Sequence, residues 1–307
     1  MKISIIGAGQ VGATAALRIA EKELAKEVIL VDIVSGLAKG KALDMSQAAH
    51  IEGHDVKIKG TENFEEIKDS NIVICTAGLT RKPGMSREDL LEKNVEIVKS
   101  VCENIKNYAP NSILIMVTNP LDIMSYLALK VTGFDKKKVI GMAGILDSAR
   151  LGTFIAEELN ISKKDVKPMV LGGHGDSMVA LPEHTIINDK PLTELTTKEI
   201  IKKLNEKTKE GGAEIVKHLK TSAWYAPGSA VAKMVEVISK DSKEILPVSV
   251  YLNGEYGYKD IFLGVPVKLG KAGVEGIVEL KLSEESKKSL DNSAEITRKN
   301  IENLSLD

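Results

Sequence analysis

The chain has 307 residues, of which 43% are hydrophobic, and a formal net charge of -1. This hydrophobic share supports a sizeable core, and the length suggests about two domains. The near balance of charges gives no reason to expect a polyanionic partner such as nucleic acid, and no apolar run approaches the ~20 residues that cross a bilayer. The two cysteines, Cys75 and Cys102, lack CxxC spacing, which favours a reducing cytoplasm over a disulfide scaffold.

Short runs rich in Ile and Val recur through the first half of the chain. Each run is too short for a helix and lacks polar alternation, which is typical of strands buried on both faces of a sheet. The alternation of these strands with helix-like segments predicts a parallel sheet with right-handed crossovers. The expected strands cover residues 2–6, 28–33, 72–76, 112–118 and 139–142, and the expected helices cover 11–23, 37–50, 87–108 and 122–131.

The second half of the chain has a mixed pattern. Helices are expected over residues 148–159, 197–219, 230–239 and from about Ser283, and strands near 169–171, 246–252, 261–263 and 265–269. The predicted fold class is therefore α/β, with a Rossmann-type parallel sheet in residues 1–143 and an α+β substrate domain in residues 144–307. Because no low-complexity linker separates them, we expect the two halves to pack tightly.

A GxGxxG motif directly follows the first expected strand and opens the first expected helix. Its glycines allow a tight turn and a close approach of the backbone to a pyrophosphate, while the helix N-terminus offers free N–H groups to the phosphates. Alone, the motif also fits a plain glycine-rich turn or a methyltransferase loop. It consists of Gly7, Ala8, Gly9, Gln10, Val11 and Gly12.

Asp32 lies 20 residues after Gly12, at the end of the second expected strand. A carboxylate in that place can accept hydrogen bonds from the adenosine ribose hydroxyls, whereas it would repel a 2'-phosphate. An ordinary turn residue at a strand end would look the same. The spacing from the glycine motif favours a dinucleotide site, with NAD rather than NADP as the cofactor.

His174 lies among small residues in the segment GGHGD, directly after an expected strand, where a substrate could approach the imidazole closely. The other histidines lack this setting. His50 and His54 have the i, i+4 spacing of a helical metal-binding pair, but Gly53 intervenes and no third ligand is evident. Surface or capping roles are expected for them, and no metal site is predicted.

Two further segments carry charged groups suited to binding an acid. Asp147 and Arg150 are three residues apart and therefore share one side of an expected helix, although a capping acid with a surface salt bridge would give the same pattern. Arg81 and Arg87 flank a Pro-Gly turn beyond the carboxyl end of an expected strand, where ligands bind in open α/β sheets. A basic solvent loop is the other explanation for this pair.

Together these segments resemble the lactate/malate dehydrogenase superfamily, from Met1 essentially to the C-terminal helix. The most similar group is the lactate-dehydrogenase-like malate dehydrogenases. The resemblance implies reversible hydride transfer between NAD and C2 of malate or oxaloacetate, a step of the tricarboxylic acid cycle, in a homotetramer or, as the next option, a dimer. The segments that carry it are GAGQVG from Gly7, Asp32, TAGLTRKPGMSR from Thr76, VTNPLD from Val117, LDSAR from Leu146 and GGHGDSMV from Gly172.

The resemblance also implies roles around the substrate. His174 would exchange a proton with the C2 oxygen, and Asp147 would hold its imidazole in one tautomer. Arg150 would bind the C1 carboxylate through two parallel hydrogen bonds. Arg87 would close over the site and polarise the ketone. The implied roles continue with Asn119 on the substrate oxygen, Ser222 facing the substrate, and Thr76, Ala77, Gly78, Asn94, Val117, Thr118 and Asn119 along the cofactor.

Arg81 distinguishes between the possible substrates. In the family, the position before Lys-Pro-Gly tends to be Gln in lactate enzymes and Arg in malate enzymes, because a guanidinium can pair with the second carboxylate of oxaloacetate. Pyruvate would leave this cation unpaired, which costs roughly 2–5 kcal/mol. Met85, where lactate enzymes usually carry Glu, agrees with malate. The alternatives are a lactate or broader 2-hydroxy acid dehydrogenase and, more distantly, a non-catalytic NAD-binding protein.

Overall fold

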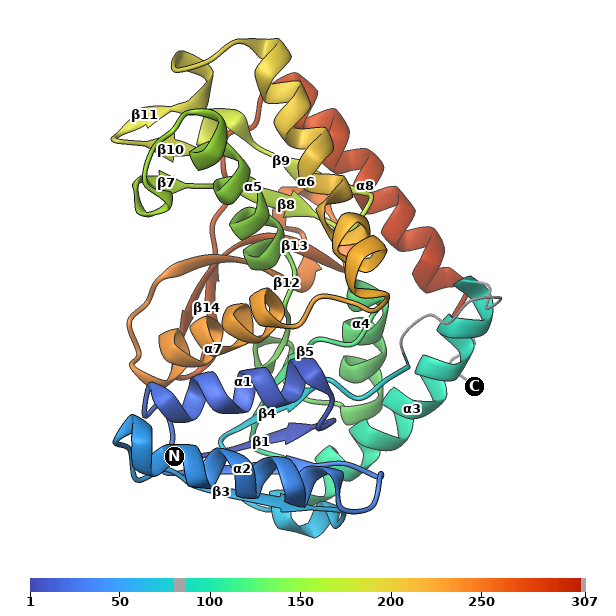
Figure 1. Cartoon of the computed structure of the whole chain (residues 1–307). Helices are drawn as coiled ribbons and strands as arrows, with labels where there is room; N and C mark the ends of the chain where they lie inside the picture. The colour runs from blue at the N-terminus through green and yellow to red at the C-terminus, as the bar shows by residue number, and fades with distance from the viewer. Residues whose placement is uncertain (80–86, 305–307) are drawn as a thin grey trace.

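A parallel sheet underlies the first half of the chain (Figure 1). The computed structural model describes residues 1–79 and 87–304, with side chains from residue 90 onward in the second range. Within these ranges, the first six strands of the sheet lie in the order β3-β2-β1-β4-β5-β6, and every neighbouring pair is parallel. They span Lys2–Ile6 (β1), Glu27–Val31 (β2), Lys57–Thr61 (β3), Ile72–Cys75 (β4), Ile113–Met116 (β5) and Val139–Gly141 (β6).

Helices cover both faces of this parallel sheet (Figure 1). α1 contacts α2, and α3 packs along α4. The chain runs outward from β1 to β3 and then returns to β4, so right-handed crossovers place the later helices on the opposite face. The strand order reverses between β1 and β4, which is the arrangement of a Rossmann-type sheet. The helices span Gln10–Glu21 (α1), Leu37–Glu52 (α2), Arg87–Tyr108 (α3) and Leu121–Thr132 (α4).

The sheet continues from the first half of the chain into the second. β6 pairs antiparallel with β12 through Gly141 and Ser249, and the order proceeds as β12-β13-β8-β9 with β14 beside β13. In the described part of the chain, one sheet thus holds 11 strands. This arrangement confirms the expected α/β class, with a Rossmann-type sheet followed by an α+β half. The added strands span Val170–Gly172 (β8), Met178–Ala180 (β9), Ile245–Asn253 (β12), Lys259–Gly270 (β13) and Gly273–Ile277 (β14).

Further helices and a small antiparallel sheet complete the second half. The helices span Gly144–Glu158 (α5), Lys198–Leu219 (α6), Tyr225–Ser239 (α7) and Glu284–Glu302 (α8). The small sheet joins Val166–Lys167 (β7), Ile186–Ile187 (β10) and Lys190–Pro191 (β11). Short 3-10 turns cover Phe64–Ile67 (η1), Lys136–Lys138 (η2), Lys163–Asp165 (η3), Pro182–His184 (η4), Leu192–Glu194 (η5) and Glu255–Gly257 (η6).

One hydrophobic core extends across both halves because the shared sheet carries buried residues from each. Ile5 and Ile115 on the parallel strands and Phe262 on β13 are all fully buried in it. Complete burial of a side chain of this size contributes about 1.5–3 kcal/mol. A smaller cluster, formed by Leu151, Ile155, Val170, Ile201 and Leu204 among others, holds α5 against α6. None of the described helices is long and apolar enough to cross a membrane.

Several elements differ from the sequence prediction. β3 is missed because its alternating KIKGT pattern belongs to an outermost strand with Lys57 and Lys59 exposed, and lysines protect the unpaired backbone of such strands. α7 begins at Tyr225, earlier than the expected residue 230, since Pro227 falls in the first turn, where N–H groups have no intrahelical partner. β13 is one strand rather than two because it pairs with β12 along its length.

Of the surface and capping roles expected for His54, the surface role is wrong. Its side chain is buried, at 8% exposure, and its Nδ1 accepts a hydrogen bond from the backbone N–H of Val56 at 3.3 Å. His50 is exposed near the end of α2. Among the described residues, no group of three or more His, Cys, Asp or Glu side chains could hold a metal ion.

Candidate active site

The carboxyl ends of β1, β2, β4 and β5 lie together on one side of the parallel sheet. Ligands of open α/β sheets bind outside these ends, at the point where the strand order reverses. The glycine motif follows β1, Asp32 follows β2, residues 76–78 follow β4 and residues 117–119 follow β5. The structure therefore brings the segments of the expected dinucleotide site together.

The glycine motif forms a cradle that larger residues would fill. A Cβ atom on Gly12 would lie 2.0 Å from the carbonyl oxygen of Gly7, and Gly7 itself has a φ of +102°. α1 begins at Gln10, and in this described segment its N-terminus has neither a side-chain cap nor an acidic residue in the first turn. The free N–H groups and the positive end of the helix dipole suit a pyrophosphate, so the residues present fit NAD.

Asp32 directly follows β2 and braces the glycine motif. Its Oδ2 accepts a hydrogen bond from the backbone N–H of Ala8 at 2.7 Å, and its Oδ1 accepts one from the N–H of Val34 at 2.9 Å. Each carboxylate oxygen has a second lone pair. Asp32 can therefore hold the turn and still accept hydrogen bonds from ribose hydroxyls.

The side chains of Thr76 and Thr118 form hydrogen bonds between the loops that follow the strands. Oγ1 of Thr76 donates to the carbonyl oxygen of Gly7 at 2.9 Å. Oγ1 of Thr118, which is buried, donates to the carbonyl oxygen of Ala77 at 2.6 Å. These bonds connect the loops after β1, β4 and β5 and so fix the shape of the cradle.

Asn94 on α3 connects two of the same loops. It is 1% exposed, accepts a hydrogen bond at Oδ1 from the N–H of Leu79 at 2.8 Å, and donates from Nδ2 to the carbonyl oxygen of Asn119 at 2.8 Å. Its amide is thus engaged with backbone groups. In this arrangement Asn94 shapes the loops beside the expected cofactor pocket.

His174, Asp147 and Arg150 form one connected cluster. Nδ1 of His174 lies 2.8 Å from Oδ2 of Asp147, and Nη1 of Arg150 donates to Oδ1 of the same carboxylate at 3.2 Å. Asp147 is 1% exposed. α5 carries both Asp147 and Arg150, while His174 comes from the turn after β8. Because the carboxylate is buried and shared with an imidazole, the alternative of a surface salt bridge does not hold.

The surroundings of His174 favour its protonated form. Burial by itself lowers the pKa of the imidazole, but the charge and hydrogen bond of Asp147 and the charge of Asp122 raise it, with Arg150 acting in the opposite direction. The net result is a pKa above the usual value of 6.5. With Nδ1 engaged by Asp147, Nε2 is the nitrogen that remains to exchange a proton.

Asp122 belongs to the same cluster, a role that the sequence does not predict. It is buried in the first turn of α4, and it accepts hydrogen bonds from the backbone N–H of His174 at 2.9 Å and from the hydroxyl of Ser249 at 2.6 Å. The signal was present in the VTNPLD segment. An acidic residue in a first helical turn is, however, already explained by the helix dipole, so the sequence gives no separate sign that Asp122 binds the backbone of His174.

The remaining expected substrate residues are two exposed polar residues and three residues whose side chains lie outside the described part of the chain. Asn119 is exposed after β5, and Ser222 is exposed in the connection between α6 and α7. Arg87 is the first residue of α3, with its side chain outside the described part. Arg81 and Met85 lie outside the described residues.

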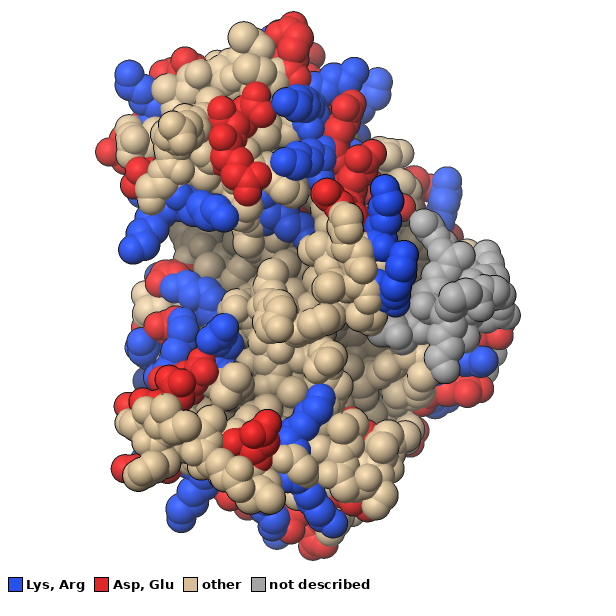
Figure 2. Space-filling model, in the orientation of Figure 1, with Lys and Arg blue, Asp and Glu red and all other residues tan. Residues whose placement is uncertain are grey.

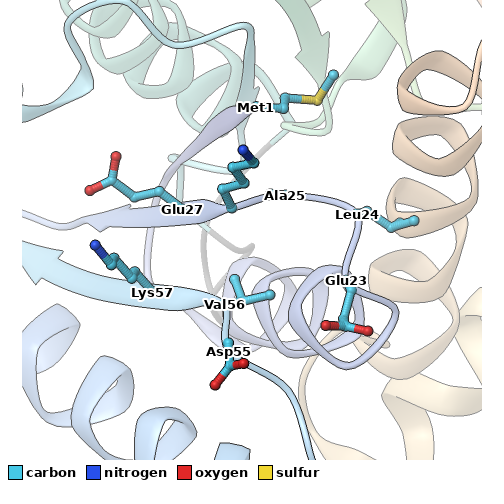
Figure 3. Close-up of a pocket in the computed structure, with 9 residues that line it drawn as sticks. Met1, Glu23, Leu24, Ala25, Glu27, Asp55, Val56 and Lys57 are labelled. Carbon is cyan, nitrogen blue, oxygen red and sulfur yellow. The ribbon is translucent and has the colours of Figure 1, made fainter.

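A separate cavity of about 660 Å³ lies at the amino-terminal ends of β1, β2 and β3 (Figure 3). This is the side of the sheet opposite to the strand ends that carry the glycine motif and Asp32. Its lining mixes acidic, basic and apolar side chains, so no single charge is favoured there. The lining residues are Met1, Glu23, Leu24, Ala25, Lys26, Glu27, Asp55, Val56 and Lys57.

Comparison with known families accounts for nearly the whole chain. The lactate/malate dehydrogenase NAD binding domain matches residues 1–141, and the lactate/malate dehydrogenase alpha/beta C-terminal domain matches residues 145–305. The first match covers the parallel sheet with its glycine motif. The second covers the half that carries Asp147, Arg150 and His174.

Individual relatives match over their full length. The malate dehydrogenase of Methanosarcina barkeri is 55% identical over 306 residues, covering 99% of each chain, and that of Chlorobium limicola is 53% identical over 305 residues, covering 99% of this chain and 98% of the relative. The solved malate dehydrogenase of Salinibacter ruber is 47% identical with a TM-score of 0.94, covering 98% of this chain and 97% of that one. The lactate dehydrogenase of Cryptosporidium parvum, solved with lactic acid and NAD, is 39% identical with a TM-score of 0.94, covering 99% and 98%. The chain therefore belongs to the lactate/malate dehydrogenase family.

Proposed function

We propose that this chain is an NAD-dependent malate dehydrogenase of the lactate-dehydrogenase-like group, which interconverts malate and oxaloacetate. The observation that carries the proposal is the buried pair of His174 and Asp147, 2.8 Å apart and joined to Arg150, in a chain with an NAD binding domain. A protein that only binds NAD has no use for such a cluster. Full-length relatives named malate dehydrogenase favour a dicarboxylate over lactate as the substrate.

His174 is the general acid–base of the proposed reaction. NAD, when bound, supplies the carbon that accepts or returns the hydride at C2 of the substrate. Nε2 of His174 donates a proton to the C2 oxygen during oxaloacetate reduction and accepts it during malate oxidation. Asp147 keeps a proton on Nδ1 and stabilises the imidazolium, so the ring always presents Nε2 to the substrate.

Arginines hold the charged ends of the substrate. Arg150 binds the C1 carboxylate through two parallel hydrogen bonds, a geometry that lysine cannot reproduce. Arg81 pairs with the second carboxylate, and Arg87 polarises the ketone as water is expelled. Asn119 hydrogen-bonds the substrate oxygen and Ser222 faces the substrate. The roles of Arg81 and Arg87 rest on the sequence, since their side chains are not described.

The residues proposed to bind NAD lie in the glycine motif and in the loops at the carboxyl ends of the strands. The N–H groups at the start of α1 bind the pyrophosphate. The carboxylate of Asp32 accepts hydrogen bonds from the ribose hydroxyls and would repel a 2'-phosphate. Val117 and Thr118 line the nicotinamide pocket. The other proposed cofactor residues are Gly7, Ala8, Gly9, Gln10, Val11 and Gly12 in the glycine motif, and Thr76, Ala77, Gly78, Asn94 and Asn119 in the adjoining loops.

The experiment that tests this function compares two substrates and two cofactors. Purified protein is mixed with oxaloacetate or pyruvate and with NADH or NADPH, and the loss of reduced-nicotinamide absorbance is followed. We expect rapid oxidation of NADH with oxaloacetate and far slower oxidation in the other combinations. Preference for pyruvate would establish a lactate dehydrogenase instead, and binding of NADH without turnover of either acid would leave only a nucleotide-binding protein.

We also propose that the chain forms a homotetramer, with a dimer as the next option. Large apolar side chains are exposed on two parts of the surface: Leu43 (61%) and Ile51 (85%) on α2, and Val216 (44%), Leu219 (47%) and Tyr225 (66%) on α6 and α7. Figure 2 shows that the middle of one face is mostly uncharged, between zones where acidic and basic side chains mix. Large apolar side chains exposed on neighbouring turns of one helix, or on two successive helices, favour association. Light scattering should give a multiple of 33.2 kDa, and the mass of a single chain would contradict the proposal.

We propose a cytoplasmic location and a place in the tricarboxylic acid cycle. Cys75 and Cys102 are both free and buried, which suits a reducing compartment. Burial raises the pKa of the Cys75 thiol to about 11, so it stays protonated and unreactive. Cell fractionation, with activity followed by oxaloacetate-dependent NADH oxidation, would test the location.

A further inference from the structure

Asp122 connects the NAD-binding half of the chain to the catalytic imidazole. It lies in the first turn of α4, three residues after Asn119, in the segment matched by the NAD binding domain. Its Oδ2 accepts a hydrogen bond from the backbone N–H of His174 at 2.9 Å, and its Oδ1 accepts one from the hydroxyl of Ser249 on β12 at 2.6 Å. A single carboxylate thus contacts both the turn that carries the imidazole and a central strand of the second half.

We propose that Asp122 is a positioning residue that sets the orientation of His174, an inference that rests on the proposed dehydrogenase function. Asp122 acts through His174, whose backbone it holds. Asp147 holds the same residue by its ring. His174 is therefore held at two points, by its backbone from the first half of the chain and by its ring from the second.

The contacts of Asp122 are not those of an ordinary helix cap. A carboxylate in a first helical turn usually serves the free N–H groups of its own helix. Here the two oxygens accept instead from groups 52 and 127 residues away along the chain. The residue is only 7% exposed, and a carboxylate is buried at this depth only when donors satisfy it. The site therefore depends on the exact placement of the His174 backbone and of the Ser249 hydroxyl.

The charges around the imidazole give Asp122 a second effect. The groups that face His174 are Asp147 and Arg150 from α5 and Asp122 from α4. Burial lowers the pKa of His174, the two carboxylates raise it, and Arg150 lowers it. Burial raises the pKa of Asp122, and the charge of Asp147 acts in the same direction. The hydrogen bonds from Ser249 and His174 and the charge of His174 lower it. Loss of the Asp122 charge should therefore leave His174 less easily protonated.

The test compares Asp122→Asn with Asp122→Ala. The amide of Asn can still accept from the backbone of His174 and can donate to the hydroxyl of Ser249, so Asp122→Asn keeps the geometry and removes the charge. Asp122→Ala removes both. Each variant is characterised by kcat and KM for oxaloacetate, by the pH profile of kcat/KM, by NADH affinity from fluorescence titration, and by Tm.

We expect Asp122→Ala to lower kcat by about 100-fold, the loss that a shift of about 1 Å in a reacting group produces. Asp122→Asn should recover part of kcat and move the descending limb of the reduction profile to lower pH. NADH affinity should stay unchanged in both. If Asp122→Asn folds with the wild-type Tm and keeps both kcat and the pH profile, Asp122 has only a packing role and the proposal is overturned.

Ser125→Ala is the matched control. Ser125 is buried on the same helix one turn further on, and its hydroxyl donates only to the carbonyl oxygen of Leu121. This variant should keep the wild-type pH profile. A shift of that profile as large as the one in Asp122→Asn would also overturn the proposal. Wild-type protein that turns over neither oxaloacetate nor pyruvate would overturn the proposed function itself, an outcome that is distinct from a change confined to the variants.

Discussion

Oδ2 of Asp147 lies 2.8 Å from Nδ1 of His174, with the carboxylate side chain 2% exposed and the imidazole side chain 13% exposed. In a site of low polarity this charge-assisted hydrogen bond is stronger than it would be in water. It selects the tautomer with the proton on Nδ1. It also outweighs, together with the charge of Asp122, the tendency of burial to discharge the imidazole.

Replacement of Asp147 by Asn should reduce activity through this bond. Asp147→Asn removes the charge that raises the pKa of His174, so burial would then lower that pKa and the acid form would become scarce near neutrality. We expect kcat for oxaloacetate to fall by about 10²- to 10⁴-fold, the usual contribution of a general acid. Asp135→Asn, which changes an exposed carboxylate before η2, should keep full activity. Equal rates in the two variants would contradict the role of Asp147.

The two directions of the reaction should depend on pH in opposite ways. In the proposed mechanism oxaloacetate reduction needs protonated His174, so its rate should be full below the pKa of that residue and fall as the pH rises through it. Malate oxidation needs the neutral ring and rises over the same range. Because the pKa lies above 6.5, both changes should be centred above that pH. Parallel profiles in the two directions would show that another group transfers the proton.

Arg81→Gln should change the choice of substrate. Under the proposed role of Arg81, oxaloacetate would lose the partner of its second carboxylate, whereas pyruvate would no longer bury an unpaired cation. We expect kcat/KM for oxaloacetate to fall by about 30-fold or more, and that for pyruvate to rise, in line with the roughly 2–5 kcal/mol of a truncated buried ion pair. The measurement is initial rates with both acids at saturating NADH. Unchanged values for both acids would remove Arg81 from the binding site.

Gly12→Ala should disrupt the cradle for the cofactor. The added Cβ would lie 2.0 Å from a backbone oxygen, so the turn must shift, and such overpacking costs about 1–3 kcal/mol. We expect a lower Tm and a large loss of NADH affinity. Gly40→Ala on α2 is the control, because its Cβ meets nothing within 4 Å and the helix should gain about 1 kcal/mol. Wild-type NADH binding by Gly12→Ala would show that the cradle tolerates a side chain.

The sequence predicts the parallel half of the fold well because its strands are buried on both faces. β1 matches its expected range residue for residue, and β4, β5 and β6 differ by a few residues at their ends. A doubly buried strand needs an unbroken apolar run, which is easily recognised. β3 escapes this criterion because it lies outermost and alternates Lys57 and Lys59 with less polar residues.

Relations between distant segments could not be predicted in the same way. The cluster of His174 with Asp147 follows from a motif, but the bond from Asp122 to the His174 backbone depends on how α4 meets the turn after β8. No local period records that meeting. The pairing of Gly141 with Ser249 is likewise set by tertiary packing, so a list of separate strands does not reveal that they share a sheet.

The backbone pairing of β6 with β12 has a consequence for synthesis of the chain on the ribosome. About 100 residues separate Gly141 from Ile245, so the N-terminal half is translated long before its neighbouring strand exists. At roughly 5–20 residues per second, the outer side of β6 waits about 5–20 s for its partner. During this interval the nascent chain has an unpaired strand at the edge of its sheet. A chain that ended near Ala143 would keep this unpaired edge and should aggregate rather than form a stable half-enzyme.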